Sequence, residues 1–196
     1  IYIMTTRWTW HPLSEPQQNI AAQLSRELHL PVPVARILVR RGVTSVQDAN
    51  NFFHPKLQDL HDPFLMKDMD RAVARLNKAL GTKEPILVYG DYDVDGTTAV
   101  ALVYKFLRIA GCSEAQLHYY IPDRGDDGYG VSYTGIDYAA RRGVKLIIVL
   151  DCGIKATREI AYAKSLGIDF IVCDHHQPDA ELPPAEAVLD AKREDN

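Results

Sequence analysis

Apolar residues in the first third of the chain recur every three or four positions, which is the spacing of amphipathic helices. Capping residues, prolines and glycines set the predicted limits of three helices. The first runs from Ser14 to Leu28, and Gln17 completes a capping box with Ser14. The second runs from Pro33 to Arg41 and is ended by Gly42, and the third is capped by Thr44 and ends near Phe53. A fourth helix is predicted over residues 68–80, with Gly81 at its end. No chemistry-bearing pattern interrupts this stretch, so residues 1–84 are predicted to form a helical N-terminal segment.

The pattern changes at Pro85, where short apolar runs begin to alternate with helical patterns. Five runs have the length of buried strands: 86–89, 117–121, 146–150, 170–173 and 187–189. Three helical patterns lie between them: 97–110, 132–142 and 157–166, with Gly143 and Gly167 after the last two. This alternation predicts an α/β domain over residues 85–196, in which a mainly parallel sheet carries helices on both faces.

Composition narrows the class of protein without identifying it. Of 196 residues, 46% are hydrophobic and 24% are charged, which is typical of a globular protein and excludes fibrous and disordered classes. The longest aliphatic run, 146–150, is far too short to span a membrane. Cys112, Cys152 and Cys173 form no paired motif, so we expect free thiols and a cytoplasmic location without membrane association.

The net charge argues against a broad nucleic-acid-binding surface. The chain has 22 basic and 26 acidic side chains, a net of −4, whereas proteins that grip phosphate backbones widely are usually basic. Any contact with nucleic acid is therefore expected to be local, or to be completed by parts outside these residues.

Acidic or imidazole side chains directly follow three of the predicted strands. The segments are Gly90-Asp91-Tyr92-Asp93-Val94-Asp95-Gly96, Asp151-Cys152-Gly153 and Asp174-His175-His176. Ligands of parallel sheets bind outside the carboxyl ends of the strands, so these groups are expected to converge on one rim. If the first segment is extended, Asp91, Asp93 and Asp95 face one side. Carboxylates packed this closely need cations, and oxygen ligands with imidazole favour Mn²⁺ or Mg²⁺ over structural zinc.

The first acidic segment also fits two other motifs in part. Asp91 to Gly96 matches the start of an EF-hand calcium loop, but Leu102 occupies the twelfth position, where that loop needs a glutamate. Asp93-Val94-Asp95-Gly96-Thr97 after a strand resembles the nucleophile motif of haloacid-dehalogenase-type phosphatases. That alternative makes Asp93 a nucleophile, and it stays open on this segment alone.

Four groups of motifs, in order, resemble the DHH phosphoesterase superfamily, and more closely its RecJ family of single-strand-specific DNA exonucleases. The groups are 88–96, 121–124 with 127–130, 150–153 and 174–176. Segments 40–43, 52–55 and 62–69 are similar to the region that precedes the catalytic domain in that family. The resemblance therefore covers nearly the whole chain.

The resemblance implies a two-metal phosphodiesterase, with Mn²⁺ or Mg²⁺, that degrades single-stranded DNA from 5′ to 3′ in DNA repair and recombination. The catalytic residues that it implies are Asp93, Asp95, Asp151, His175 and His176: the first four as metal ligands, with Asp151 bridging two ions, and His176 at the scissile phosphate. It also implies a ligand or orienting role for Asp91 and support of a histidine by Asp174. Arg124 and Tyr129 are expected to bind substrate, although a loop salt bridge and simple packing are their alternatives.

One position departs from the RecJ pattern: Asp127 stands where RecJ proteins usually have glutamate. Tyr89 stands where other branches of the superfamily have histidine, which is consistent with the nuclease branch. The family's fourth-motif aspartate, second domain and nucleic-acid-binding module are expected beyond Asn196. We therefore expect the domain to be incomplete at its C-terminal end, and this segment alone to bind Mn²⁺ weakly and to be inactive.

Three classes of function follow from the resemblance. The first is a RecJ-type exonuclease, for which the family also implies helicase or single-strand-binding protein partners. The second is a phosphoesterase acting on short oligonucleotides, nucleoside bisphosphates or cyclic dinucleotides. The third is a non-catalytic replication scaffold that has lost its ligands, and retention of the aspartates and histidines argues against it.

Overall fold

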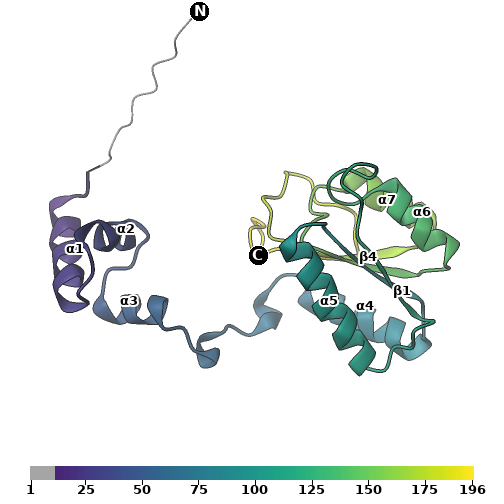
Figure 1. Ribbon diagram of the computed structural model, residues 1–196, viewed down its shortest axis with the longest axis horizontal. Helices are drawn as coiled ribbons and strands as arrows, with labels where there is room; N and C mark the ends of the chain where they lie inside the picture. The colour runs from purple at the N-terminus through teal and green to yellow at the C-terminus, as the bar shows by residue number, and fades with distance from the viewer. Residues whose placement is uncertain (1–11) are drawn as a thin grey trace, which may run out of the picture. The chain divides into compact units, whose positions relative to one another are not determined.

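The computed structural model describes residues 12–196, and the predictions that fall on residues 1–11 lie outside this range. The chain divides into two compact units, Ile1–His61 and Asp62–Asn196 (Figure 1). Within the described range, no helix is both long and apolar enough to cross a membrane.

The first unit consists of short helices around a small apolar core. Its elements are α1 (Glu15–Glu27), α2 (Val32–Arg40), α3 (Val46–Phe53) and the 3₁₀ turn η1 (Leu57–Asp59). The core contains Leu13, Ala21, Leu24, Ala35, Val39 and Ala49. The predicted stop at Gly42 is confirmed, because this glycine has a φ of 84° directly after the last turn of α2.

The predicted cap of α3 is wrong by one residue. Ser45, not Thr44, caps this helix, and its hydroxyl oxygen accepts from the Asp48 N–H at 3.0 Å. Both residue types can cap a helix, and the bond forms from the one that lies three residues before a free amide of the first turn. The pattern alone did not distinguish the two neighbours.

The second unit begins with the 3₁₀ turn η2 (Pro63–Leu65) and helix α4 (Met69–Thr82). Gly81 was predicted to end this helix, but it lies inside the last turn. The left-handed residue is Lys83, with a φ of 57°, and its N–H bonds the carbonyls of Ala79 and Leu80. Since the space around Gly81 is open, the helix passes through this position without hindrance.

Five parallel strands form one sheet in the second unit, which confirms the predicted α/β fold. The strands are β1 (Ile86–Gly90), β2 (Leu117–Tyr120), β3 (Leu146–Leu150), β4 (Asp169–Cys173) and β5 (Ala187–Leu189). Their order is β2-β1-β3-β4-β5, and every neighbouring pair is parallel. The helices between them are α5 (Val94–Ile109), α6 (Tyr133–Arg141) and α7 (Thr157–Ser165).

Helices cover both faces of this sheet, as predicted (Figure 1). Alternate residues of each strand enter different cores: Leu87 and Tyr89 pack with α6 and α7, whereas Ile86 and Val88 pack with α4 and α5. Burial of both faces explains why the strands read as continuous apolar runs in the sequence.

Helix α4 is attached to the sheet by a buried arginine. Arg75 is 7% exposed, and its guanidinium pairs with Asp169 at 2.7 Å and with Glu84 at 2.8 Å. It also donates to the Lys145 carbonyl at 3.1 Å. Helix α4 therefore lies in the second compact unit, which begins at Asp62. A domain boundary between residues 84 and 85 stays a prediction.

Arg75→Ala should lower the free energy of unfolding by about 1–3 kcal/mol, because it removes the buried guanidinium that joins α4 to Asp169, Glu84 and the Lys145 carbonyl. Arg71 on the same helix is the matched control, since it is half exposed and its pairs with Asp68 and Glu186 measure 3.4 and 3.8 Å. Arg71→Ala should cost less than about 1 kcal/mol. Chemical denaturation of both variants tests this, and equal effects would contradict the attachment by Arg75.

Candidate metal centre

The crevice of this sheet lies between β1 and β3. Strand β1 connects to β2 through α5 on one face, and β2 returns to β3 through α6 on the other face. Ligands of open α/β sheets bind where the connections diverge in this way. The last residues of β1, β3 and β4 (Gly90, Leu150 and Cys173) are in register, and each is followed directly by an aspartate, so the predicted convergence of the strand ends is confirmed.

A first group of possible metal ligands contains Asp91, Asp93 and Asp151, each with one carboxylate oxygen within 4.8 Å of the others. Asp91 is 2% exposed, and its Oδ1 has no hydrogen-bond partner among residues 12–196. A buried carboxylate oxygen without a donor is costly unless a cation or another partner compensates it. The group therefore fits a divalent cation with oxygen ligands.

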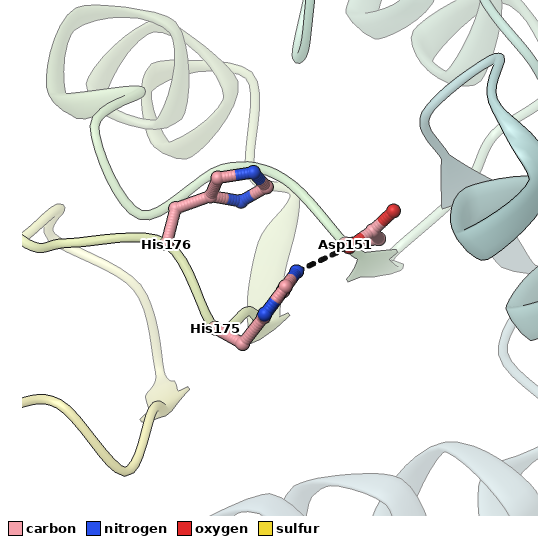
Figure 2. A group of neighbouring side chains, drawn as sticks. All are labelled: Asp151, His175 and His176. Carbon is pink, nitrogen blue, oxygen red and sulfur yellow. Dashed lines mark ion pairs between the residues drawn. The ribbon is translucent and has the colours of Figure 1, made fainter. Parts of the chain in front are cut away.

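A second group contains Asp151, His175 and His176, whose ligand atoms also lie within 4.8 Å of one another. Figure 2 shows the His175 ring directed at the carboxylate of Asp151, with 3.0 Å between Nε2 and Oδ1. Asp151 is the member common to both groups. This is the position that a ligand shared by two ions would occupy, although the bridging role itself stays a prediction.

Asp151 has an unusual backbone and a perturbed carboxyl. Its φ is 61°, in the left-handed region that aspartate and asparagine tolerate better than most residues. Burial raises the pKa of its carboxyl, and the negative charge of Asp93 raises it further. Ionisation of Asp151 is therefore less favourable in the folded chain than in the unfolded chain.

The alternation of its aspartates suggested that the first acidic segment is extended. In the structure, the segment instead turns into helix α5. Asp93 is the N-cap of α5, and its Oδ1 accepts from the N–H groups of Asp95 at 3.0 Å and Gly96 at 3.1 Å. The helix therefore begins at Val94 instead of the predicted Thr97. Asp95 lies in the first turn, outside both ligand groups.

Asp95 still faces the site from a neighbouring cavity. This cavity has a volume of about 510 Å³ and is lined by Met66, Asp95, Ala99, Asp151, Cys173, Asp174, His175 and Leu189. The structure thus places Asp95 on the same hollow as Asp151 and His175, so a ligand role for Asp95 stays a prediction.

Asp174 organises the two histidines. Its Oδ1 accepts from the backbone N–H of His175 at 2.7 Å and of His176 at 3.1 Å, and lies 2.7 Å from His176 Nδ1. Its Oδ2 accepts from the Ile154 N–H at 3.0 Å. Burial alone would raise the pKa of Asp174, but these hydrogen bonds lower it below its ordinary value. The negative carboxylate therefore orients the imidazole of His176.

The loop between β2 and α6 carries the two predicted substrate residues. The Tyr129 hydroxyl lies 3.3 Å from His176 Nε2, and the ring is 59% exposed. The Arg124 guanidinium forms no ion pair in the described part of the chain and lies 5.5 Å from the centre of the Tyr92 ring. The loop salt bridge considered as an alternative for Arg124 is therefore not formed.

Asp127 and Tyr89 hold this loop through hydrogen bonds. Asp127 accepts from the Tyr120 hydroxyl at 2.8 Å, the Asp123 N–H at 3.0 Å and the Ser132 hydroxyl at 3.2 Å. The Tyr89 hydroxyl donates to the Gly130 carbonyl at 2.8 Å and accepts from the Ser132 N–H at 3.1 Å. Both residues therefore support the loop, a role that the sequence pattern did not predict.

Two free cysteines, Cys152 and Cys173, lie next to the site residues in the sequence. Cys152 is buried below Asp151, and burial raises the pKa of its thiol strongly. Burial also raises the pKa of Cys173 to about 12. Both cysteines are free, as expected, and both lie outside the two groups of possible metal ligands.

Comparison with known proteins agrees with this geometry. The sequence model described as "DHH family, N-terminal domain" matches residues 85–196. The single-stranded-DNA-specific exonuclease RecJ of Bacillus subtilis is 38% identical over 191 residues, which are 97% of this chain and 24% of the relative. The chain thus spans about a quarter of the length of that relative.

Two solved structures have the same fold. A crystal structure of exonuclease RecJ bound to manganese superposes with a TM-score of 0.60 at 32% identity, over 67% of this chain and 33% of the other. RecJ from Thermus thermophilus in complex with Mn²⁺ gives 0.62 at 26% identity, over 88% and 23%. The haloacid-dehalogenase alternative finds no support in these matches. On the family match and the shared fold, the chain belongs to the DHH family.

Proposed function

We propose that the full-length protein is a metal-dependent phosphodiesterase that degrades single-stranded DNA from 5′ to 3′, in the manner of a RecJ-type exonuclease. The observation that carries this proposal is Asp151, which belongs to both ligand groups at the crevice of the sheet. The similarity to proteins named single-stranded-DNA-specific exonucleases supports the substrate class.

The residues present fit two divalent cations, Mn²⁺ or Mg²⁺. Asp91, Asp93 and Asp151 would hold one, and Asp151 with His175 and Asp95 would hold the other. When bound, such ions supply electrostatic stabilisation of a pentavalent phosphate and lower the pKa of water. Asp91 and Asp93 enter this site on a fixed backbone, because Asp93 also caps α5.

The chain's own side chains would position the DNA. Arg124 forms no ion pair within residues 12–196, and its guanidinium would bind a phosphate of the DNA backbone. The exposed ring of Tyr129 would stack on a base, which is a sequence-tolerant contact. His176, which Asp174 holds in place, lies beside Tyr129 and would donate a hydrogen bond or a proton to the scissile phosphate. These contacts are few and local, in keeping with a net charge of −4.

The proposal is tested by incubating the full-length protein with Mn²⁺ and single-stranded DNA labelled at the 5′ or the 3′ end. We expect early release of the 5′ label as a mononucleotide and at least about 100-fold slower release in the His175→Ala variant, which removes a metal ligand. Duplex DNA and dinucleotides serve as parallel substrates.

Two outcomes would contradict the proposal. Preference for dinucleotides over long single strands would favour the small-substrate phosphoesterase. Binding of DNA without any cleavage would favour the scaffold. Helicase or single-strand-binding partners and a cytoplasmic location stay predictions of the family resemblance.

A further inference from the structure

Tyr92 lies between two predicted metal ligands, Asp91 and Asp93, and its backbone is held on both sides. The backbone of Asp91 packs directly against Gly96, where a Cβ atom would come within 2.4 Å of the Asp91 carbonyl oxygen. On the other side, Asp93 is fixed by the hydrogen bonds that cap α5. The point from which the Tyr92 side chain projects is therefore set by the fold.

The ring of Tyr92 lies outside the two apolar cores of the second unit. It is half-buried and belongs to neither of the two apolar clusters that cover the sheet. Its contacts are with the two substrate residues of the neighbouring loop: the Tyr129 ring, edge to face at 6.4 Å between centroids, and the Arg124 guanidinium, 5.5 Å from the ring centre. Packing of the core therefore does not explain this aromatic side chain.

Tyr129 contacts both Tyr92 and His176. Its ring lies edge to face with His176, with the centroids 6.1 Å apart, and its hydroxyl lies 3.3 Å from Nε2. Arg124 and Tyr129 belong to a loop in which Gly128 and Gly130 have φ values of 79° and 82°. The hydrogen bonds of Asp127 hold the loop near its two ends, so the side chains at Arg124 and Tyr129 depend on other contacts for their orientation.

We propose that Tyr92 is a positioning residue for substrate, which fixes the Arg124 guanidinium and the Tyr129 ring relative to the metal centre. The inference rests on the proposed function and adds to it a residue that the motif pattern did not assign. The Arg124 guanidinium lies over the Tyr92 ring at cation–π distance, 5.5 Å from the ring centre, and this contact uses none of its N–H groups, which stay available to a phosphate. The cation–π contact favours one orientation of Arg124 before DNA binds, which lowers the entropic cost of binding.

A double-mutant cycle in the full-length protein tests this role. Tyr92→Leu should lower kcat/KM for single-stranded DNA by on the order of 10-fold, mainly through a higher KM, because misplaced contact groups weaken binding. In the Arg124→Ala background, the same change should cost at most about threefold, because coupled residues are not additive. Tyr92→Phe keeps the ring and should stay within about twofold of the wild type.

Controls separate this role from damage to the fold or the metal centre. Tyr104→Leu makes the same change on α5, where Tyr104 packs edge to face with Tyr119 at 5.9 Å, and should leave kcat/KM unchanged. Thermal unfolding and Mn²⁺ titration should give Tyr92→Leu the same values as the wild type.

Additive effects of Tyr92→Leu and Arg124→Ala would overturn the inference, and so would a Tyr92→Phe variant with the low activity of Tyr92→Leu. A loss of Mn²⁺ affinity in Tyr92→Leu would also overturn it, because Tyr92 would then support the metal ligands instead. A wild-type protein without nuclease activity would refute the proposed function. A Tyr92→Leu variant with the kcat/KM of the wild type would refute only the positioning role.

Discussion

Replacing Asp151 by asparagine should reduce the nuclease activity of the full-length protein by at least about 100-fold, because divalent ions supply several kcal/mol of charge stabilisation in such sites. Asp151 is the one residue common to both groups of candidate ligands in the described chain, so its loss weakens both ion sites at once. Digestion of labelled single strands at saturating Mn²⁺ measures the loss, and Mn²⁺ titration measures the accompanying loss of affinity.

The same substitution should stabilise the metal-free chain, and the gain should depend on pH. Burial and the charge of Asp93 raise the folded-state pKa of Asp151 above its ordinary value of 3.8. The folded wild type therefore loses stability as the pH rises from 3.8 through the raised pKa, since ionisation is then easier in the unfolded chain. Asparagine does not ionise, so the variant does not lose stability in this way. The difference in free energy of unfolding between variant and wild type should therefore be small below pH 3.8 and reach its full size at neutral pH.

Asparagine is the informative replacement because of the backbone at Asp151. Its φ of 61° is tolerated by asparagine, whereas alanine would add about 1 kcal/mol of strain and obscure the electrostatic gain. Asp179→Asn is the matched control, since Asp179 forms an exposed pair with Lys155 and should change stability by less than about 1 kcal/mol. Activity within a few-fold of the wild type, or a variant less stable in EDTA at pH 7, would contradict the central place given to Asp151.

The fold of the second unit was predictable because its sheet is buried on both faces. Continuous apolar runs such as 146–150 and 170–173 leave few alternatives to buried strands, and the observed β3 and β4 differ from these predictions by at most one residue. The limits of helices were less predictable, because neighbouring residues compete for the same cap. Ser45 took the place assigned to Thr44, and Lys83 took the left-handed position assigned to the end of the helix at Gly81.

The site was predictable as far as the topology determines it. Parallel strands in register bring Asp91, Asp151 and Asp174 to one edge of the sheet, and the sequence shows where each strand ends. The double use of Asp93, as helix cap and candidate ligand, depends on the turn into α5 and not on spacing. The contacts of Tyr92 with a loop more than thirty residues away are long-range packing, which no local pattern in this sequence records.

Gly96→Ala should be among the most damaging single changes in the second unit, although it adds only one methyl group. The new Cβ would lie 2.4 Å from the carbonyl oxygen and 2.5 Å from the nitrogen of Asp91, and both are backbone atoms that no side-chain rotation can move. The steric clash can be relieved only if α5 separates from the end of β1, and this movement would displace Asp91 and Asp93 together. We expect a loss of about 2–4 kcal/mol in the free energy of unfolding and at least about 100-fold in Mn²⁺-dependent nuclease activity.

Gly81→Ala is the matched control, because it makes the same change inside a helix of the same unit. No atom lies within 4 Å of the position its Cβ would take, and α4 continues through this residue. Alanine there should raise the free energy of unfolding by about 0.5–1 kcal/mol, because it reduces the conformational freedom of the unfolded chain. Denaturant titration of the two variants gives the opposite signs directly. If Gly96→Ala were as stable as the wild type and bound Mn²⁺ normally, the close packing of α5 on Asp91 would be wrong, and with it the explanation of how this loop holds two candidate ligands in place.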